Sequence, residues 1–282
     1  MKKATKILTH IPLYVWLILF TVVPLLMIFF YAVFEVSLDG IHFTTSHLTY
    51  VITNTDYINA TVRSIHYAVI STLVCLVIGY PLAYILAKLP ERRRNFMSVL
   101  LLLPMWMNFL IRTYALMSLI DEDGIITKIF STLGFGGGML KGTDAAIVIG
   151  MVYNFLPFLI LPIYTSMMKI DQRLIEAAQD LGGNNLVVFR KIIFPLTVPG
   201  TISGITMVFV PCVTSFIIPQ LLHNNAWTIG KLIEYKFVSS ASADSVSPDG
   251  SALSFFLMLL VFLCMSIFNL VDKDNEEGGA ML

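Results

Sequence analysis

The sequence has few charged residues. They make up 13% of its 282 residues, against 57% hydrophobic ones, whereas about a quarter of a typical soluble domain is charged. So few charges cannot cover the surface of a water-soluble protein of this length, which excludes a soluble globular enzyme. The 18 basic and 18 acidic residues give a formal net charge of zero, so the chain as a whole offers no basic surface to a nucleic acid.

Cysteine and histidine are also scarce. The three cysteines, Cys75, Cys212 and Cys264, are far apart and each lies in an apolar run, a pattern that fits neither a disulfide framework nor metal-ligand spacing. None of the five histidines pairs with another at i, i+4 around a carboxylate, as a zinc-protease helix would require. We therefore predict no metal site and no catalytic residue, and interpret the cysteines as packing residues.

Long hydrophobic runs dominate the rest of the chain. Five stretches without Asp, Glu, Lys or Arg exceed the roughly 20 residues that a helix needs to cross a bilayer, and a sixth is interrupted only by Arg112. Because such runs satisfy their backbone in lipid as helices, we expect an all-α integral membrane protein with six transmembrane helices. The expected spans are approximately residues 11–34, 64–87, 96–118, 145–168, 197–222 and 251–271. The first lacks a small-x-small cleavage site, so we expect it to be retained and not removed as a signal peptide.

The basic residues indicate the orientation of these spans. Twelve are expected in the cytoplasm, namely Lys2, Lys3, Lys6, Lys88, Arg92, Arg93, Arg94, Lys169, Arg173, Arg190, Lys191 and Lys273. Five are expected outside, namely Arg63, Lys128, Lys141, Lys231 and Lys236. By the positive-inside rule, the N-terminal segment 1–10 and the acidic tail 272–282 both lie in the cytoplasm and flank a transmembrane domain of residues 11–271. We expect a multi-pass protein of a bacterial cell membrane.

Acidic residues are absent from all six expected spans. A carrier driven by protons or other ions usually holds such groups in its spans, because they bind and release the driving ion. The glycine-rich stretch 134–138, with Lys141-Gly142-Thr143 nearby, does not have the order of a phosphate-binding loop. The energy for transport must therefore come from another protein, unless the chain forms a passive pore.

The segment 169–196, between the fourth and fifth spans, is predicted to fold as helix, turn and helix. The boundary signals are Asp171 as the first N-cap, Gly182 and Gly183 as the left-handed stop, Asn184 or Asn185 as the second N-cap, and Pro195 as the end. One face of the first helix holds Leu174, Ala177, Ala178 and Leu181. We therefore expect an amphipathic hairpin at the membrane surface, whose alanines allow another backbone to come close.

This segment closely resembles the EAA loop of ABC importer permeases. It reads Glu176-Ala177-Ala178, three residues, Gly182, nine residues, Ile192, one residue, and then Phe194-Pro195 where Leu-Pro is usual. Further runs resemble the spermidine/putrescine branch of that family, namely residues 79–84, 87–90, 103–106, 111–114 and 195–200. The resemblance covers roughly residues 15–270, nearly the whole chain.

The resemblance implies a fold, partners and residue roles. The fold would be that of type I, MetI-like ABC importer permeases, with a second permease subunit forming a heterodimer. Two copies of a cytoplasmic ABC ATPase would bind ATP and Mg²⁺, leaving this chain without a cofactor, and an extracellular or periplasmic binding protein would deliver the substrate. Glu176 would anchor the ATPase, Ala177 and Ala178 would form the close-packing surface, and Gly182 would form the turn.

The branch of the family implies a polyamine substrate, a flexible polycation that carboxylates and aromatic faces attract. We expect an acidic outer mouth with Asp121, Glu122 and Asp123, and a path formed by Trp106, Asn108, Tyr153 and Asn154. Counting about 1.5 Å per residue puts Arg112 about 24 Å along its span, near the outer headgroups, where it can snorkel or meet Asp121 and Glu122. The alternatives are an ABC permease for another small solute and an ATP-independent channel or secondary carrier.

Overall fold

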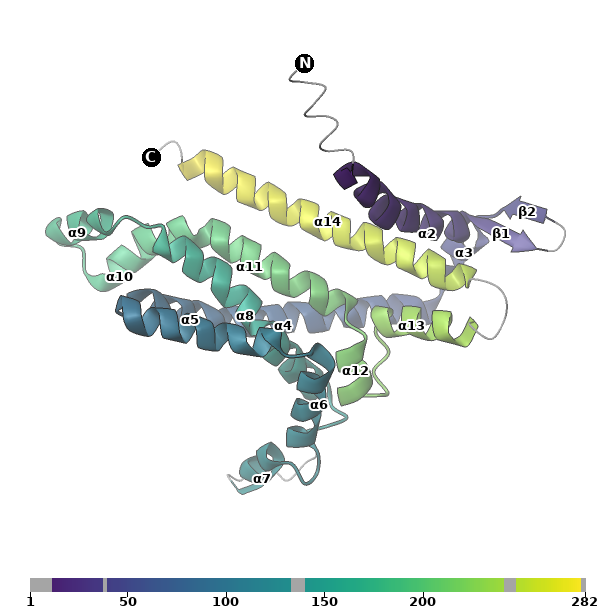
Figure 1. The fold of residues 1–282 in the computed structure, drawn as a ribbon, viewed down its shortest axis with the longest axis horizontal. Coiled ribbons are helices and arrows are strands. Elements are labelled where there is room, and N and C mark those ends of the chain that lie inside the picture. Colours follow the sequence, from purple (N-terminus) through teal and green to yellow (C-terminus); the bar gives the residue numbers. More distant parts are fainter. Residues whose placement is uncertain (1–11, 38–39, 133–139, 241–246, 280–282) are drawn as a thin grey trace, which may run out of the picture. The chain divides into compact units, whose positions relative to one another are not determined.

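The computed structural model (Figure 1) describes residues 12–37, 40–132, 140–240 and 247–279. The chain divides into two compact units. The first unit comprises residues 1–61 and 232–260, and the second comprises residues 62–231 and 261–282. Helices make up nearly all of the described residues. The expected N-terminal segment 1–10 lies outside the described residues.

The first unit contains an apolar helix followed by a short β-hairpin. The apolar segment Pro12–Val33 includes the π-helical turn η1 (Ile18–Val22) and α2 (Val23–Val33). Strands β1 (Phe34–Ser37) and β2 (Gly40–Phe43) pair antiparallel, with Phe34 opposite Phe43. The sequence analysis did not predict this hairpin, because strands of four residues are too short to give a clear alternation.

All or part of four further helices completes the first unit. They are α3 (Ser46–Thr53), residues 55–61 of α4 (Thr55–Lys88), most of α13 (Ile229–Ser240) and residues 248–260 of α14 (Pro248–Gly279). His47 Nδ1 is hydrogen-bonded to Asp249 Oδ1 at 2.9 Å, and Lys236 Nζ lies 3.4 Å from Asp249 Oδ2. Asp249 therefore ties the start of α14 to both α3 and α13.

The second unit holds most of the long helices. In chain order they are α4 (Thr55–Lys88, from residue 62), α5 (Glu91–Trp106), α6 (Phe109–Ile120), α7 (Ile125–Thr132), α8 (Asp144–Met168), α9 (Gln172–Asp180), α10 (Asn185–Val188), the π-helical turn η2 (Phe189–Ile193), α11 (Phe194–Thr214) and α12 (Ile217–Leu222). The described part of the chain has five helices long and apolar enough to cross a membrane. They are Pro12–Val33, Thr55–Lys88, Asp144–Met168, Asn185–Thr214 and Pro248–Leu270.

The sixth expected span, at residues 96–118, is not one straight helix. Glu91–Trp106 and Phe109–Ile129 are together long and apolar enough for one span, but they meet at an angle of 94°. Met107 leaves the helix with extended backbone angles, and the Asn108 side chain caps the next helix by accepting from the backbone N–H groups of Leu110 and Ile111. The expectation of a continuous helix here was wrong, because an N-capping residue starts a new helix inside an apolar run.

Pro195 does not end the helix that precedes it, contrary to the sequence analysis. The chain continues from α10 through η2 into α11, and Pro195 lies in the first turn of α11. The π-helical turn shifts the hydrogen bonding, so that the Phe194 N–H bonds to the Phe189 carbonyl, and a proline just inside a new helical segment lacks a donor that is not needed there. The helix then stops at Thr214, and α12 is a separate helix within the expected span 197–222.

α8 and α11 pack closely along the second unit. A Cβ atom on Gly200 would lie 2.7 Å from the Pro162 carbonyl oxygen and would also overlap the Ser166 hydroxyl. One turn further, a Cβ on Gly204 would lie 3.0 Å from the Leu159 carbonyl oxygen. Small residues spaced four apart let two helix backbones approach closely in a membrane, so these glycines determine how near α11 lies to α8.

Candidate functional site

The hairpin formed by α9 and α10, residues 171–188, has the local structure that the sequence predicts. Asp171 caps α9 by accepting a hydrogen bond of 3.0 Å from the Arg173 N–H, and Asn184 caps α10 by accepting one of 2.9 Å from the Val187 N–H. Gly182 has φ +81°, the left-handed conformation that ends α9. Gly183, also expected to be left-handed, is not among the described residues with positive φ. A single glycine therefore makes the turn.

One face of α9 is apolar and uncovered within this chain. Leu181 is 90% exposed and Leu174 is 49% exposed, while Ala177 is exposed and Ala178 is half-buried. The alanines expose α9 backbone between these two leucines. An exposed helix face of this kind suits the surface of a partner protein.

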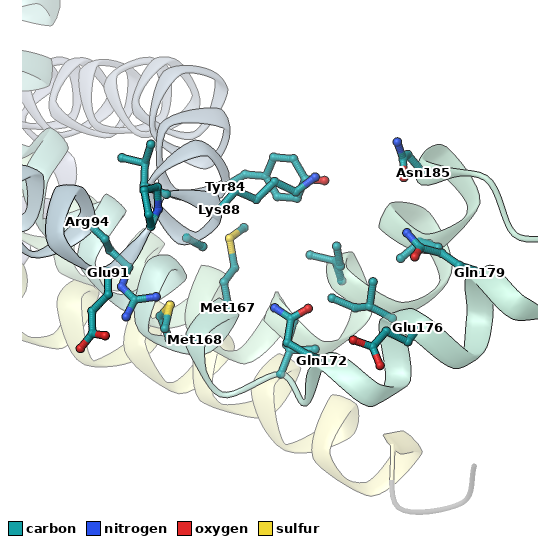
Figure 2. A pocket seen from close by; sticks show the side chains of 17 residues that line it. Tyr84, Lys88, Glu91, Arg94, Met167, Met168, Gln172, Glu176, Gln179 and Asn185 are labelled. Carbon is teal, nitrogen blue, oxygen red and sulfur yellow. The ribbon is translucent and has the colours of Figure 1, made fainter.

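Glu176 lies on a different face of α9, beside a cavity of about 720 Å³ (Figure 2). Gln172, Glu176 and Gln179, spaced at i, i+4 and i+7, line the cavity together, and Asn185 lines it from α10. The sequence analysis assigned Glu176 as a polar anchor and Ala177, with Ala178, as a close-packing surface. Because neighbouring residues on a helix do not face the same way, the structure separates them.

The opposite wall of this cavity comes from the ends of α4 and α8. Tyr84 and Lys88 line it from α4, with Lys88 Nζ 4.3 Å from the centre of the Tyr84 ring, and Met167 lines it from α8. The sequence analysis did not assign Tyr84 or Gln172 to this site. Their distance in the sequence gives no signal, because four helices, α5 to α8, lie between Tyr84 and Gln172 along the chain.

An aromatic cluster joins the π-helical turn η2 to α4. The Phe189 ring lies 5.5 Å from the Tyr84 ring and 5.9 Å from the Tyr80 ring, centre to centre. The Tyr80 hydroxyl is hydrogen-bonded to the Thr197 hydroxyl at 2.8 Å. The hairpin is therefore held against α4 at the point where it continues into α11.

The α5–α6 bend holds a buried arginine. Arg112 is only 4% exposed, and it donates hydrogen bonds from Nε to Asn154 Oδ1 at 2.7 Å and from Nη1 to the Pro104 carbonyl at 2.8 Å. Among the described residues it forms no ion pair with Asp121 or Glu122, so the expected contact with those carboxylates was wrong. The bend brings the guanidinium back toward α5 and α8, where neutral acceptors satisfy it.

The four residues assigned to a substrate path have different surroundings. Asn154 is fully buried and holds Arg112, while Asn108 caps α6. Trp106 is 80% exposed at the end of α5, and Tyr153 is 44% exposed, with its ring centre 6.0 Å from the Arg112 guanidinium carbon. Tyr153 and Asn154 thus both lie beside Arg112, whereas Trp106 is exposed at the end of α5.

The three acidic residues after α6 are partly neutralised by lysines. Asp121 Oδ2 lies 2.9 Å from Lys141 Nζ, and Asp123 Oδ1 lies 3.5 Å from Lys128 Nζ. The hydrogen bond from Lys141 lowers the pKa of Asp121, and one from the Glu122 backbone adds to this effect. The local excess of negative charge is therefore smaller than the sequence alone suggests. Within the described ranges, no group of three or more His, Cys, Asp and Glu side chains could hold a metal ion.

This fold and its exposed hairpin define an inner-membrane transport subunit. The family of binding-protein-dependent transport system inner membrane components matches residues 79–275, and the chain belongs to this family. It is therefore a multi-pass inner-membrane protein. It is 35% identical to the spermidine/putrescine transport system permease protein PotB of Escherichia coli strain K12, over 93% of this chain and 97% of that protein. The PotB protein of Haemophilus influenzae is 34% identical, over 92% of this chain and 91% of that protein.

Solved structures show the same fold. A chain of a bacterial ABC transporter that imports the acidic polysaccharide alginate superposes with a TM-score of 0.71, at 16% identity, covering 97% of this chain and 96% of that chain. A chain of the methionine ABC transporter MetNI, in an inward-facing conformation, gives a TM-score of 0.58 at 16% identity, covering 77% of this chain and 95% of that chain. The predicted ABC importer permease fold is confirmed.

Proposed function

We propose that this chain is the permease subunit of an ABC importer for polyamines, spermidine or putrescine, and that it couples ATP hydrolysis by partner ATPases to translocation. The observation that carries the coupling role is the α9–α10 hairpin, a capped and tightly turned element whose apolar face is uncovered. The identity to PotB proteins over almost the whole chain supports the substrate class.

The hairpin is built to pass a displacement into the membrane. α10, η2 and α11 form a continuous helix over Asn185–Thr214, so motion at the hairpin reaches α11 without an intervening loop. The close approach of Gly200 to α8 then carries the motion to a second long helix. Allosteric coupling between the ATPase and the transport path needs a rigid element whose position depends on the state of both sites.

Within the proposed complex, Ala177, Ala178 and the exposed leucines of α9 contact the ATPase, and Gly182 sets the turn. Glu176 is the polar anchor at the edge of the contact. Two ATPase copies bind ATP and Mg²⁺, a second permease subunit completes a heterodimer, and an external binding protein delivers the substrate. Both termini of this chain, with the α4–α5 turn and the hairpin, lie in the cytoplasm.

The proposed substrate path uses the aromatic surfaces at the α5–α6 bend. Trp106 and Tyr153 offer exposed ring faces to an alkylammonium group, and each such contact is worth about 0.5–2 kcal/mol. Asn108 and Asn154 set the geometry by capping α6 and by holding Arg112. Weak contacts spread along a path favour release of a polycation on the far side.

The test is uptake of labelled spermidine and putrescine by proteoliposomes that contain the whole complex, with and without ATP. We expect uptake only with ATP and binding protein, and slower uptake after Trp106→Leu or Tyr153→Leu with basal ATP hydrolysis retained. Trp16→Leu, at an aromatic residue that is also exposed (62%) but far along the chain from the bend, is the matched control. Uptake without ATP would favour a channel or secondary carrier. ATP-dependent uptake of a different solute would show that this solute, and not a polyamine, is the substrate.

A further inference from the structure

An apolar groove of about 380 Å³ runs between α4, α5 and α8 in the second unit. Every side chain that lines it is Leu, Ile, Met or Pro, including Leu86, Leu101, Pro104, Pro157 and Ile160. Leu89 lines both this groove and the cavity beneath the α9–α10 hairpin. The groove therefore ends at the α4–α5 turn, next to the element proposed to contact the ATPase.

Cations continue the groove at this end. On α5 the lining positions are 97, 100, 101 and 104, and positions 93 and 94 lie one turn earlier on the same helix face. Both are arginines, Arg93 and Arg94. On α4 the lining positions are 82, 85 and 86, and Leu89 follows directly after the helix. Lys88, the last residue of α4, follows Ile85 by three residues. The faces that are apolar along the groove thus become basic at its end.

The charge of this end is strongly positive. Residues 88–94 contain Lys88, Arg92, Arg93 and Arg94 against the single carboxylate of Glu91. Among the described residues, none of the five ion pairs includes any of these four cations. Lys88 instead lies over the Tyr84 ring, and Figure 2 shows Lys88 and Arg94 on the α4–α5 side of the hairpin cavity.

The groove and its basic end together match one leaflet of a bilayer in length. Ten residues separate Arg94 from Pro104, which is about 15 Å along a helix at 1.5 Å per residue. This is about half of the roughly 30 Å hydrocarbon thickness of a membrane. A molecule with a charged head at Arg94 and an apolar chain reaching Pro104 would span one leaflet.

We propose that this groove and its four cations form a binding site for an anionic phospholipid. The phosphate and glycerol head lies among Lys88, Arg93 and Arg94, and an acyl chain fills the groove between α4, α5 and α8. Basic pockets between membrane helices bind anionic headgroups in this way. In the topology proposed above this is the cytoplasmic leaflet, so the choice of leaflet rests on the proposed function. The lipid site itself does not depend on which solute is transported.

The test is a titration of the purified complex with phosphatidylglycerol or phosphatidylcholine of identical acyl chains, read by native mass spectrometry. Phosphatidylglycerol is expected to bind more tightly, and Lys88→Gln with Arg94→Gln should weaken its binding about fivefold for each cation removed. Arg92 and Arg93 remain in this variant, so the positive-inside signal is kept. Arg190→Gln removes an exposed cation away from the groove and should leave binding unchanged.

A second pair of variants tests the groove itself. Ile85 is 57% exposed and lines the groove, so Ile85→Trp should fill it and reduce phosphatidylglycerol binding with no change of charge. Val77→Trp, at a 73% exposed position on the same helix outside the groove, is the control. Glycerol 1-phosphate, which lacks acyl chains, should not bind. Any one of three results would overturn the proposal: equal binding of the two lipids, an equal loss of binding in the Arg190 variant, or undiminished binding in Ile85→Trp. None of these results would change the outcome of the polyamine uptake assay, so the two proposals can fail separately.

Discussion

Arg112 Nε donates a hydrogen bond of 2.7 Å to Asn154 Oδ1, which joins α6 to α8 just beyond the α5–α6 bend. The same guanidinium donates to the Pro104 carbonyl at the end of α5, and the Asn154 amide donates to the Gly150 carbonyl within α8. No ion pair among the described residues includes Arg112. One buried cation therefore links three helices through neutral oxygen acceptors.

Removal of this cation should destabilise the protein. Arg112→Met leaves the buried Asn154 Oδ1 without its donor and leaves the Pro104 carbonyl with only the Met107 N–H, and an unsatisfied buried polar group costs about 1–3 kcal/mol. We expect a lower melting temperature for the purified complex by light scattering or intrinsic fluorescence. Arg63→Met, at an exposed arginine in α4, should leave the melting temperature close to that of the unmodified protein.

A double substitution separates the pair from its surroundings. If the two residues act through their shared hydrogen bond, Arg112→Met with Asn154→Leu should destabilise less than the sum of the single changes, with an interaction energy of about 0.5–3 kcal/mol. Strictly additive effects would show that the hydrogen bond between them contributes little to stability.

The left-handed turn at Gly182 should be required for coupling. No atom lies within 4 Å of a Cβ placed on Gly182, so any effect of a side chain there comes from the backbone conformation. A non-glycine residue in this conformation costs about 1–2 kcal/mol, which shifts the turn away from its native form by a factor of roughly 5–30. Gly182→Val should therefore reduce ATP-dependent uptake or ATPase attachment, measured by transport and by co-purification.

Gly182→Asn is the matched control, because asparagine tolerates the left-handed region better than valine. It should retain more uptake than Gly182→Val. Glu176→Lys should weaken ATPase attachment through charge instead of backbone strain, with membrane insertion intact. Normal uptake by both Gly182→Val and Glu176→Lys would contradict the coupling role of the hairpin.

The α8–α11 contact should tolerate no side chain at Gly200. A methyl group there meets the backbone carbonyl of Pro162, so the two helices must move apart and lose close packing. Gly200→Ala should lower the yield of folded protein and its melting temperature, by an overpacking cost of about 1–3 kcal/mol. Ser203→Ala, an exposed position one turn along α11, should have little effect on either measurement.

The proposed topology can be tested by labelling. In a variant without Cys75, Cys212 and Cys264, a cysteine at Asn95 should react with a membrane-impermeant maleimide only from the cytoplasmic side, and one at Glu122 only from outside. The positive-inside distribution of Lys and Arg is the physical reason. The reverse pattern would overturn the orientation of both termini together.

The acidic residues after α6 should affect uptake unequally. Glu122→Gln removes an exposed charge that forms no ion pair among the described residues, whereas Asp121→Asn also leaves Lys141 without its carboxylate. If the outer mouth attracts a polycation, neutralising Asp121, Glu122 and Asp123 together should make uptake less sensitive to ionic strength, because exposed charges act over about 8–10 Å in salt. Unchanged salt dependence would place the attraction elsewhere, such as on the partner permease.

The lowered pKa of Asp121 sets the pH range in which its charge can contribute to the salt dependence of uptake. Because the folded-state pKa lies below the ordinary value, the ion pair with Lys141 stabilises the protein above the unfolded-state pKa of about 3.9 and is lost as the pH falls through the folded-state value. Salt sensitivity that depends on Asp121 should thus be the same at pH 7 and pH 5. Because an unpaired aspartate has a pKa of about 3.9 and is also ionised at pH 5, a loss of salt sensitivity between these two values would mean that a group other than Asp121 is responsible.

Local features of the site could be predicted because short segments determine them. Asp171 and Asn184 are capping residues whose neighbours along the chain supply the bonded N–H groups, and Gly182 is left-handed because α9 ends there. The same logic failed at Asn108, which is also a capping residue but lies inside an apolar run, where hydrophobicity suggested one continuous span. Pro195 was misread because the π-helical turn before it leaves no trace in the composition.

By itself, the sequence determined that the protein is helical and embedded in a membrane, because long uncharged runs can satisfy their backbone in lipid only within helices. It also determined the caps and the turn of the hairpin, whose hydrogen bonds are local. Only the tertiary structure decided that Arg112 meets Asn154, that Glu176 faces Tyr84 and Lys88 across a cavity, and that α4, α5 and α8 enclose an apolar groove. These contacts join residues far apart in the chain, and they depend on a 94° bend and on the close approach of helices that no single segment specifies.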